Sequence, residues 1–288
     1  MGDHLAAVKH VQGDFFIADI LDAMPKDDLA SMEHPIFALK AGNTKPKKYE
    51  YNGATIEIKP NTDGQATIQD KDIWIYCISQ LVEAINRGRE DIGRTVRFTA
   101  YDFLVTTNRG TGGREYKLMA DALSRLKGTT IETNIETNGY RERRGFGLIE
   151  SWRVIEKDRE TERMVAIEVT LPDWLYRSVQ QMHVLTLSPD YFRLRKPIDR
   201  RIYELVRKHC GKQPKWEISV KNLYEKSGST DALRNFRGAM KSLAESNQLP
   251  DYRVKFDEET DKMTFYSRAS KGSQAQIKDL LSGLRNKK

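Results

Sequence analysis

One order of predicted elements occurs twice in the chain, and it constrains the fold more than any other feature of the sequence. The pattern of residues 70–157 predicts a helix, a short strand, a helix, a chain break, a third helix and a β-hairpin, and residues 197–266 repeat that order. A period above roughly 100 residues is too long for a solenoid and indicates a duplicated domain. The unit has the order of a winged helix, in which the last two helices form a helix-turn-helix and the hairpin forms the wing.

The residues of the two units agree as well as their order. In the first helix Gln80-Leu-Val82 matches Glu204-Leu-Val206, and before the second helix Phe98-Thr99 matches Ile218-Ser219. The third helices share the apolar spacing i, i+3, i+7, i+10 at two sets of positions: Tyr116, Met119, Leu123, Leu126 and Leu233, Phe236, Met240, Leu243. That spacing alone is typical of any helix that faces a core, so the prediction depends on the ordered repeat of all the parts. We therefore predict an α+β fold with two tandem winged-helix domains related by internal duplication.

The chain divides into four predicted parts. Residues 1–45 form an N-terminal segment with one short amphipathic helix near residues 15–21. Residues 46–183 form the N-terminal winged-helix domain, whose predicted wing joins a strand at 129–136 to a strand at 145–157. Residues 184–268 form the C-terminal winged-helix domain, and residues 269–288 form a flexible polar tail.

Charge and cysteine content narrow the class of partner and the compartment. The formal net charge is +7 and the pI about 9.2, a surplus that favours nucleic acid or an anionic membrane surface. No stretch approaches the roughly 18 apolar residues of a membrane span, and the first residues lack a secretory signal. Cys77 and Cys210 fall among apolar helical residues, so we expect two buried thiols in a reducing cytoplasm.

The sequence lacks the motifs of the common catalytic and cofactor sites. Gly110–Gly113 is too short for the glycine and lysine spacing of a phosphate-binding loop and serves better as the turn of a helix-turn-helix. No two of the five histidines are spaced as metal ligands, and neither cysteine has a CxxC partner. We therefore expect a protein that is not an enzyme and that holds no metal or cofactor.

The helix that starts at Thr230 carries the residues best placed to read DNA: Arg234, Asn235, Arg237 and Lys241. At about 100° per residue, its three cations fall within about 60° of one another and about a quarter turn from the apolar stripe. A helix docked by that stripe leaves them exposed. Arg can bridge O6 and N7 of guanine, and Asn can bridge N6 and N7 of adenine. The alternative is an ordinary basic face in solvent.

The corresponding helix of the first unit is a weaker candidate. It offers Arg114, Lys117 and Arg125, but Asp121 lies among them and weakens the local positive field. The predicted wing of this unit is strongly basic and could grip phosphates or enter a minor groove through Tyr140, Arg141, Arg143 and Arg144. The alternative there is a plain charged turn. The second wing tip, Asp257–Asp261, is acidic, and we expect it to point away from DNA.

Six segments of the sequence resemble the plasmid replication initiator protein A family: Ser31–Phe37, Tyr49–Gly53, Ala66–Ile73, Tyr76–Leu81, Phe146–Trp152 and Asp199–Leu205, the last similar to the linking helix of the broader Rep initiators. The resemblance implies a tandem winged-helix initiator that binds repeated sites at a plasmid origin, opens an AT-rich segment, and recruits the host initiator and the replicative helicase. It also implies a cytoplasmic homodimer that represses its own gene, with the N-terminal unit as the dimer and backbone-contact unit and the C-terminal unit as the main base reader. At matching positions, the helices that start at Arg114 and Thr230 take the role of recognition helices.

Two other functions stay open on the residues. One is a winged-helix transcriptional repressor without a role in replication, which would use the same DNA-binding helices. The other is a nicking enzyme of rolling-circle replication, against which the missing His-x-His metal motif argues.

Overall fold

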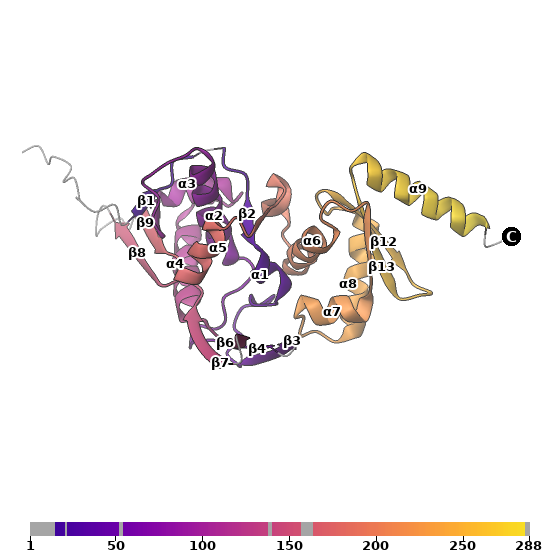
Figure 1. Ribbon diagram of the computed structural model, residues 1–288, viewed down its shortest axis with the longest axis horizontal. Coiled ribbons are helices and arrows are strands. Elements are labelled where there is room, and N and C mark those ends of the chain that lie inside the picture. The colour runs from indigo at the N-terminus through magenta and orange to yellow at the C-terminus, as the bar shows by residue number, and fades with distance from the viewer. Residues whose placement is uncertain (1–14, 21, 52–53, 138–139, 157–163, 286–288) are drawn as a thin grey trace, which may run out of the picture.

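The chain folds into two units that lie side by side, with helix α6 (Pro197–Cys210) between them (Figure 1). The structure is a computed structural model that describes residues 15–20, 22–51, 54–137, 140–156 and 164–285. Within these ranges, no helix combines the length and apolar character needed to cross a bilayer.

The first unit contains three helices and a sheet in winged-helix order. Its elements are α2 (Lys71–Asn86), β5 (Thr95–Phe98), α3 (Ala100–Thr106), α4 (Gly113–Gly128), β8 (Ser151–Glu156) and β9 (Met164–Thr170). β5 pairs antiparallel with β9, and β9 pairs antiparallel with β8. The strand β1 (Phe15–Ile17) adds a parallel edge to β5, and α5 (Asp173–Gln180) packs against α2.

The second unit repeats this arrangement. Its elements are α6, β11 (Lys215–Ser219), α7 (Val220–Ser227), α8 (Leu233–Ser246), β12 (Tyr252–Asp257) and β13 (Lys262–Ser267). The strand order β11-β13-β12 is the order β5-β9-β8 of the first unit, with the same antiparallel pairing. The prediction of two tandem winged-helix units is confirmed.

The residues that match between the two units have the same structural role, as the N-caps of α3 and α7 show. Thr99 caps the N-terminus of α3 by accepting a hydrogen bond from the backbone N–H of Asp102 at 3.0 Å. Ser219 caps α7 in the same way, accepting from the N–H of Asn222 at 3.2 Å. Such caps satisfy N–H groups that the helix itself leaves without partners.

The wing of the first unit is not the hairpin that the sequence predicted. The hairpin of β6 (Thr130–Thr137) and β7 (Tyr140–Gly147) belongs to a separate sheet with β3 (Lys47–Tyr51) and β4 (Ala54–Lys59), in the order β3-β4-β6-β7. The hairpin equivalent to β12-β13 is β8-β9, because only β9 pairs with β5 as β13 pairs with β11. The predicted strand at 145–157 is thus two strands, and residues 157–163, which join β8 to β9, lie outside the described residues.

The described part of the N-terminal segment, residues 15–20 and 22–45, packs against both units. The predicted helix near residues 15–21 is wrong, because Phe15–Ile17 is strand β1. Farther along, β2 (Lys26–Asp28) pairs with β10 (Val184–Thr186), and α1 (Leu29–Glu33) packs against α6. Phe37 is buried in the core of the first unit, while Met32 is buried in the core of the second.

The predicted flexible tail contains a helix, α9 (Ser270–Arg285), at the outer edge of the second unit (Figure 1). Asp279 fixes it to the sheet, accepting hydrogen bonds from Lys215 Nζ at 2.5 Å and from the hydroxyl of Tyr266 at 2.9 Å. The polar composition suggested a solvated tail, but these contacts place one helix face on β13. The opposite prediction arose because the anchoring carboxylate is one residue among many polar ones.

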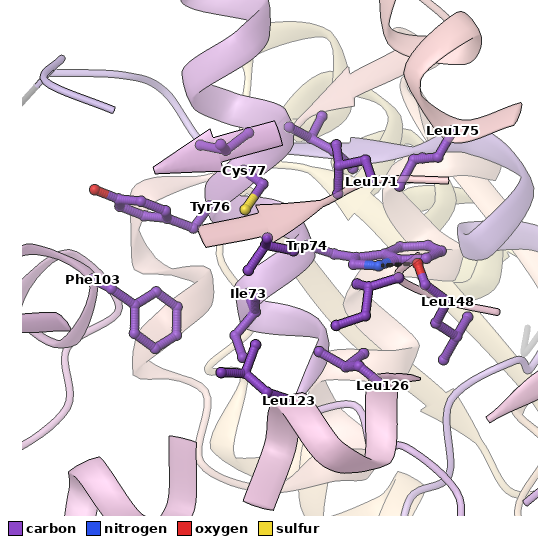
Figure 2. Packing of buried hydrophobic residues seen from close by; sticks show 14 of the residues in the cluster. Ile73, Trp74, Tyr76, Cys77, Phe103, Leu123, Leu126, Leu148, Leu171 and Leu175 are labelled. Atoms are coloured by element: carbon purple, nitrogen blue, oxygen red, sulfur yellow. Dashed lines mark hydrogen bonds between the residues drawn. The ribbon is translucent and has the colours of Figure 1, made fainter. Parts of the chain in front are cut away.

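Each unit has its own hydrophobic core, and α2 contributes to both. Figure 2 shows the first core around Trp74, whose indole Nε1–H donates to the carbonyl of Leu148 at 2.8 Å. Cys77 lies in the same core, and Cys210 lies in the second; both are buried and free, as predicted. Ile75, between two residues of the first core, is instead buried in the second. The two cores therefore meet along one face of α2.

Buried charges join the units where α2 meets α6. The Nζ atom of Lys71 lies 2.6 Å from Oδ2 of Asp27 and 3.0 Å from Oε2 of Glu204, and all three side chains are at most 1% exposed. One turn of α6 earlier, Arg200 Nη1 lies 2.5 Å from Oδ1 of Asp72 on α2. Burial raises the pKa of Asp27 despite the lysine beside it, which reflects the cost of holding a carboxylate away from water.

Arg201 extends this network to the ends of two helices. Its guanidinium donates to the carbonyls of Met32 at 2.8 Å and Glu33 at 3.0 Å at the end of α1, and to that of Lys226 at 2.9 Å near the end of α7. These are carbonyls that a helix leaves without intrahelical partners, and a cation there also interacts well with the helix dipole. α6 thus fixes α1 and α7 through one side chain.

The network predicts a large stability effect of one substitution. Lys71→Met removes the lysine that faces both buried carboxylates. Ser31 still donates to Asp27 and Arg201 still pairs with Glu204, but Asp27 keeps no cation, so we expect the free energy of unfolding to fall by about 3–5 kcal/mol in urea denaturation. The control Lys40→Met removes a lysine whose ion pair with Asp231 is exposed to solvent, and should cost under about 1 kcal/mol. Equal stability of the two variants would contradict this account of the interface.

Candidate nucleic-acid interface

The recognition helix of the second unit, α8, is docked by its apolar face. Phe236, Met240 and Leu243 are at most 2% exposed and pack in the second core, as the spacing predicted. The helix therefore turns its opposite face to solvent, and Arg234, Asn235, Arg237 and Lys241 are all exposed. Figure 1 shows α8 beside the hairpin β12-β13 of the same unit.

Two of these four side chains are paired with the acidic tip of the wing. Arg237 binds both carboxylate oxygens of Asp261, with Nε and Nη2 at 2.9 and 2.7 Å. Lys241 Nζ lies 2.7 Å from Oε1 of Glu258. The hydrogen bonds from Arg237 lower the pKa of Asp261, so this pair is charged at neutral pH. The wing tip lies against the recognition helix, a contact that was not predicted from the sequence.

A signal for the contact is present in the sequence. In a winged helix the hairpin that follows the recognition helix packs beside it, so an acidic turn such as residues 257–261 comes close to the cations of that helix. The acidic composition of the turn by itself predicts only that it points away from DNA. Its position relative to bound DNA stays a prediction, but its effect on Arg237 and Lys241 is direct.

Arg234 and Asn235 stand in different surroundings. Arg234 is exposed and forms no ion pair with any other described residue. Asn235 lines a surface hollow of about 320 Å³, shared with Lys40, Lys196 and Asp231. Of the predicted base readers on α8, Arg234 is therefore the cation most available to a ligand.

On α4, the recognition helix of the first unit, Arg114 and Lys117 are exposed, and within the described part of the chain neither has a carboxylate partner. Arg125 is unavailable, because it forms a bidentate pair with Asp70 with both contacts at 2.8 Å. Asp121 is exposed on the same helix, as its position in the sequence suggested. Two cations of α4 thus remain open to a ligand.

The three arginines predicted to grip phosphates are on β7 and not on the winged-helix wing. In the backbone register Arg141 faces Glu136 and Arg143 faces Asn134 across the β6–β7 pair. The side chains of these two arginines lie outside the described residues. Arg144 is exposed and faces Thr133. Any DNA contact by this hairpin would come from the additional sheet.

The comparisons with known proteins agree with this architecture. The sequence model of the family described as replication initiator protein A matches residues 26–254. The chain belongs to this family. A protein of Wigglesworthia glossinidia brevipalpis named "Putative replication protein" is 46% identical over 257 residues, which cover 88% of this chain and 94% of that protein. As a member of the family, the chain is a replication initiator.

Two solved structures of domains 2 and 3 of RctB share the fold. One has a TM-score of 0.63 at 9% sequence identity and covers 84% of this chain and 99% of its own. The other has a TM-score of 0.60 at 10% identity, with 85% and 99% covered. The fold likeness extends over both winged-helix units, although few residues are shared.

The acidic wing tip predicts a gain of function. Asp261→Asn frees Arg237, so we expect duplex DNA to bind a few times more tightly at low salt, with the slope of log K against log salt steeper by about 1. The matched control Glu259→Gln removes an equal charge from the same turn, at a residue that forms no ion pair with the described chain. An equal gain in both variants, measured by fluorescence anisotropy, would show an effect of net charge alone.

Proposed function

We propose that this initiator binds repeated double-stranded sites at a plasmid origin through α4 and α8, promotes opening of the origin and recruits host replication proteins. One observation carries the DNA-binding part. Each unit of an initiator-family chain exposes a recognition helix with cations that no described carboxylate neutralises: Arg114 and Lys117 on α4, and Arg234 on α8.

The two helices suit the reading of a duplex. A recognition helix of a helix-turn-helix enters the major groove, which shows a distinct pattern of donors and acceptors for each base pair. Arg234 can bridge two acceptors of guanine there. On α4 the exposed Asp121 weakens the positive field of Arg114 and Lys117, so the first unit contributes backbone contacts and register more than base reading.

Opening and recruitment rest on family membership. When two rigidly joined units bind the same duplex, the free energy of their many contacts can offset the cost of deforming the DNA. That cost is lowest at AT-rich, flexible steps. The host initiator and the replicative helicase are the partners that such an initiator needs, and a homodimer is the form in which it would repress its own gene. We also place the chain in the cytoplasm, where the plasmid is replicated.

Plasmid maintenance tests the initiation role. A plasmid that carries the origin but lacks this gene should replicate when the protein is supplied in trans. Loss of the plasmid, with the protein still bound to the origin in footprinting, would instead support a repressor without a role in replication.

We further propose that the chain acts by binding and not by DNA cleavage. Supercoiled origin DNA incubated with the protein and Mg²⁺ should remain supercoiled, and protein and DNA should separate fully in denaturing gels. A nicked product with a covalent protein–DNA adduct would contradict this and support a rolling-circle enzyme.

Base reading by Arg234 predicts a sequence-dependent loss. Arg234→Ala should weaken binding to the origin repeat by about 1–3 kcal/mol and relax the preference at one base pair. Arg237→Ala is the matched control, and it should cost less because Arg237 must leave Asp261 before it can bind DNA. Competition with duplexes changed at single base pairs measures both. A uniform loss on every sequence would show that Arg234 contacts phosphate only.

A further inference from the structure

Residues 193–196 lie between the two units and run from the end of the 3-10 helix η1 (Pro189–Arg193) to the start of α6, with three basic side chains and one inward side chain. We call them the linker segment. Leu194 is 5% exposed and packs in the second core, while Arg193, Arg195 and Lys196 are exposed. Its backbone is fixed, because the carbonyl of Leu194 accepts a hydrogen bond from Arg200 Nε at 2.7 Å. Three cations are therefore presented outward from a backbone that the core holds in place.

One side of the linker segment touches the helix-turn-helix of the first unit. Arg195 Nη2 donates to the carbonyl of Asn108 at 3.1 Å, in the turn between α3 and α4. Asn108 has a left-handed backbone with φ of 54°, which shapes this turn. Gln69 contacts Arg195 and also Arg109, the residue after Asn108: its side-chain Nε2 donates to the carbonyl of Arg195 at 3.3 Å, and its own carbonyl accepts from Arg109 Nη2 at 2.6 Å.

The other side of the linker segment reaches the recognition helix of the second unit. Lys196 lines the same hollow as Asn235 and Ala239 of α8. The linker segment thus lies between the turn that precedes α4 and the part of α8 that carries Asn235, next to the two helices that the proposed function places on DNA.

The charges of the linker segment are open to a ligand. Arg195 and Lys196 form no ion pair with another described residue, and Arg193 has only Asp190, at 3.0 Å with both side chains more than half exposed. An exposed pair of this kind contributes little, so its cation can turn to a stronger anion.

We propose that the linker segment is a binding site for the sugar-phosphate backbone of DNA, between the stretches that α4 and α8 contact. The proposal rests on the proposed DNA binding by the two recognition helices. Two helices in neighbouring major grooves are separated by a minor groove and its phosphates, and a basic segment that lies between the two helices can reach those phosphates. Cations there fix the spacing and orientation of the two units on the duplex without reading sequence.

The test compares two variants of equal charge. The linker variant carries Arg193→Gln and Lys196→Gln, and leaves Arg195 in place because its hydrogen bond supports the fold. The control carries Lys212→Gln and Lys271→Gln, two exposed lysines of the second unit. Lys212 lies just beyond the far end of α6, about 21 Å along the helix from Lys196. Affinity is measured from 0.05 to 0.2 M salt on an origin-repeat duplex and on a random duplex of the same length, salts at which phosphate contacts show clearly.

The linker variant should bind both duplexes roughly tenfold more weakly at 0.1 M salt, with the slope of log K against log salt reduced by about 1–2. The control should match the wild type. Neutral methylphosphonates between the two footprints should weaken the wild type but not the linker variant. An unchanged slope, or an equal loss in the control, would overturn the proposal. Arg193→Lys with Lys196→Arg keeps the charge, so a loss that this variant does not restore would also overturn it.

The same data distinguish a failure of the linker site from a failure of DNA reading by the two helices. If the wild type binds repeat and random duplexes equally, α4 and α8 do not read sequence. The difference in salt slope between the wild type and the linker variant would still test the linker site. A wild type that binds neither duplex would overturn both.

Discussion

The contact between Lys71 and the carboxylates of Asp27 and Glu204 holds the two units of this initiator together. A charged group without water is costly, so all three side chains must be in place at once, and each comes from a different part of the chain. Lys71 begins the first helix of one winged helix, and Glu204 lies in the middle of the first helix of the other. The hydroxyl of Tyr191 donates to Glu204 at 2.7 Å and satisfies a further oxygen. Apolar packing alone would allow the units to slide, whereas this network has one satisfied geometry.

The consequence for function is geometric. In the proposed function, α4 and α8 read DNA only at a separation that suits the duplex, and that separation follows from how α2 and α6 meet. The linker segment also depends on this fixed arrangement, since its backbone is anchored to both units and its cations point outward. The acidic wing tip acts in the opposite direction, because Asp261 and Glu258 occupy two cations of α8 until a stronger anion replaces them. If α4 and α8 bind DNA as proposed, these contacts together favour a long, correctly spaced duplex over isolated anions.

The internal repeat made the overall fold predictable from the sequence, but the details of the fold were not predictable. Periodic apolar positions located α2, α4, α6 and α8 to within a few residues, because burial of one face sets the spacing. The equivalence of Gln80 and Glu204 was also visible, but not its meaning: Gln80 binds the backbone of Ile20 through both its oxygen and its nitrogen, and Glu204 completes the ion network. Both attach the first helix of a unit to a segment distant in sequence, and no local pattern reveals that partner. The prediction of the first wing was wrong for the same reason, since β-strand pairing between distant segments decides which hairpin is the wing.

The sequence predicted which residue types lie in the candidate site better than it predicted which of them are free to bind a ligand. Composition and helix phase correctly placed Arg114, Lys117 and Arg234 on open faces. They could not show that Arg125 pairs with Asp70 or that Arg237 pairs with Asp261, because both partners approach from another element. The linker cations were passed over, since three basic residues before a helix look like any solvated loop until the two neighbouring surfaces are known.

The central claim is that a fixed frame sets the distance between the two recognition helices, and base-pair insertion tests it most directly. Once footprints define the two contacted segments of an origin repeat, five base pairs inserted between them move one segment by about half a helical turn. The account predicts that affinity falls to the level of a variant with Arg114→Ala and Lys117→Ala bound to the unaltered repeat. Affinity that is unchanged by the insertion would contradict the account and show that the units bind as if joined by a flexible tether.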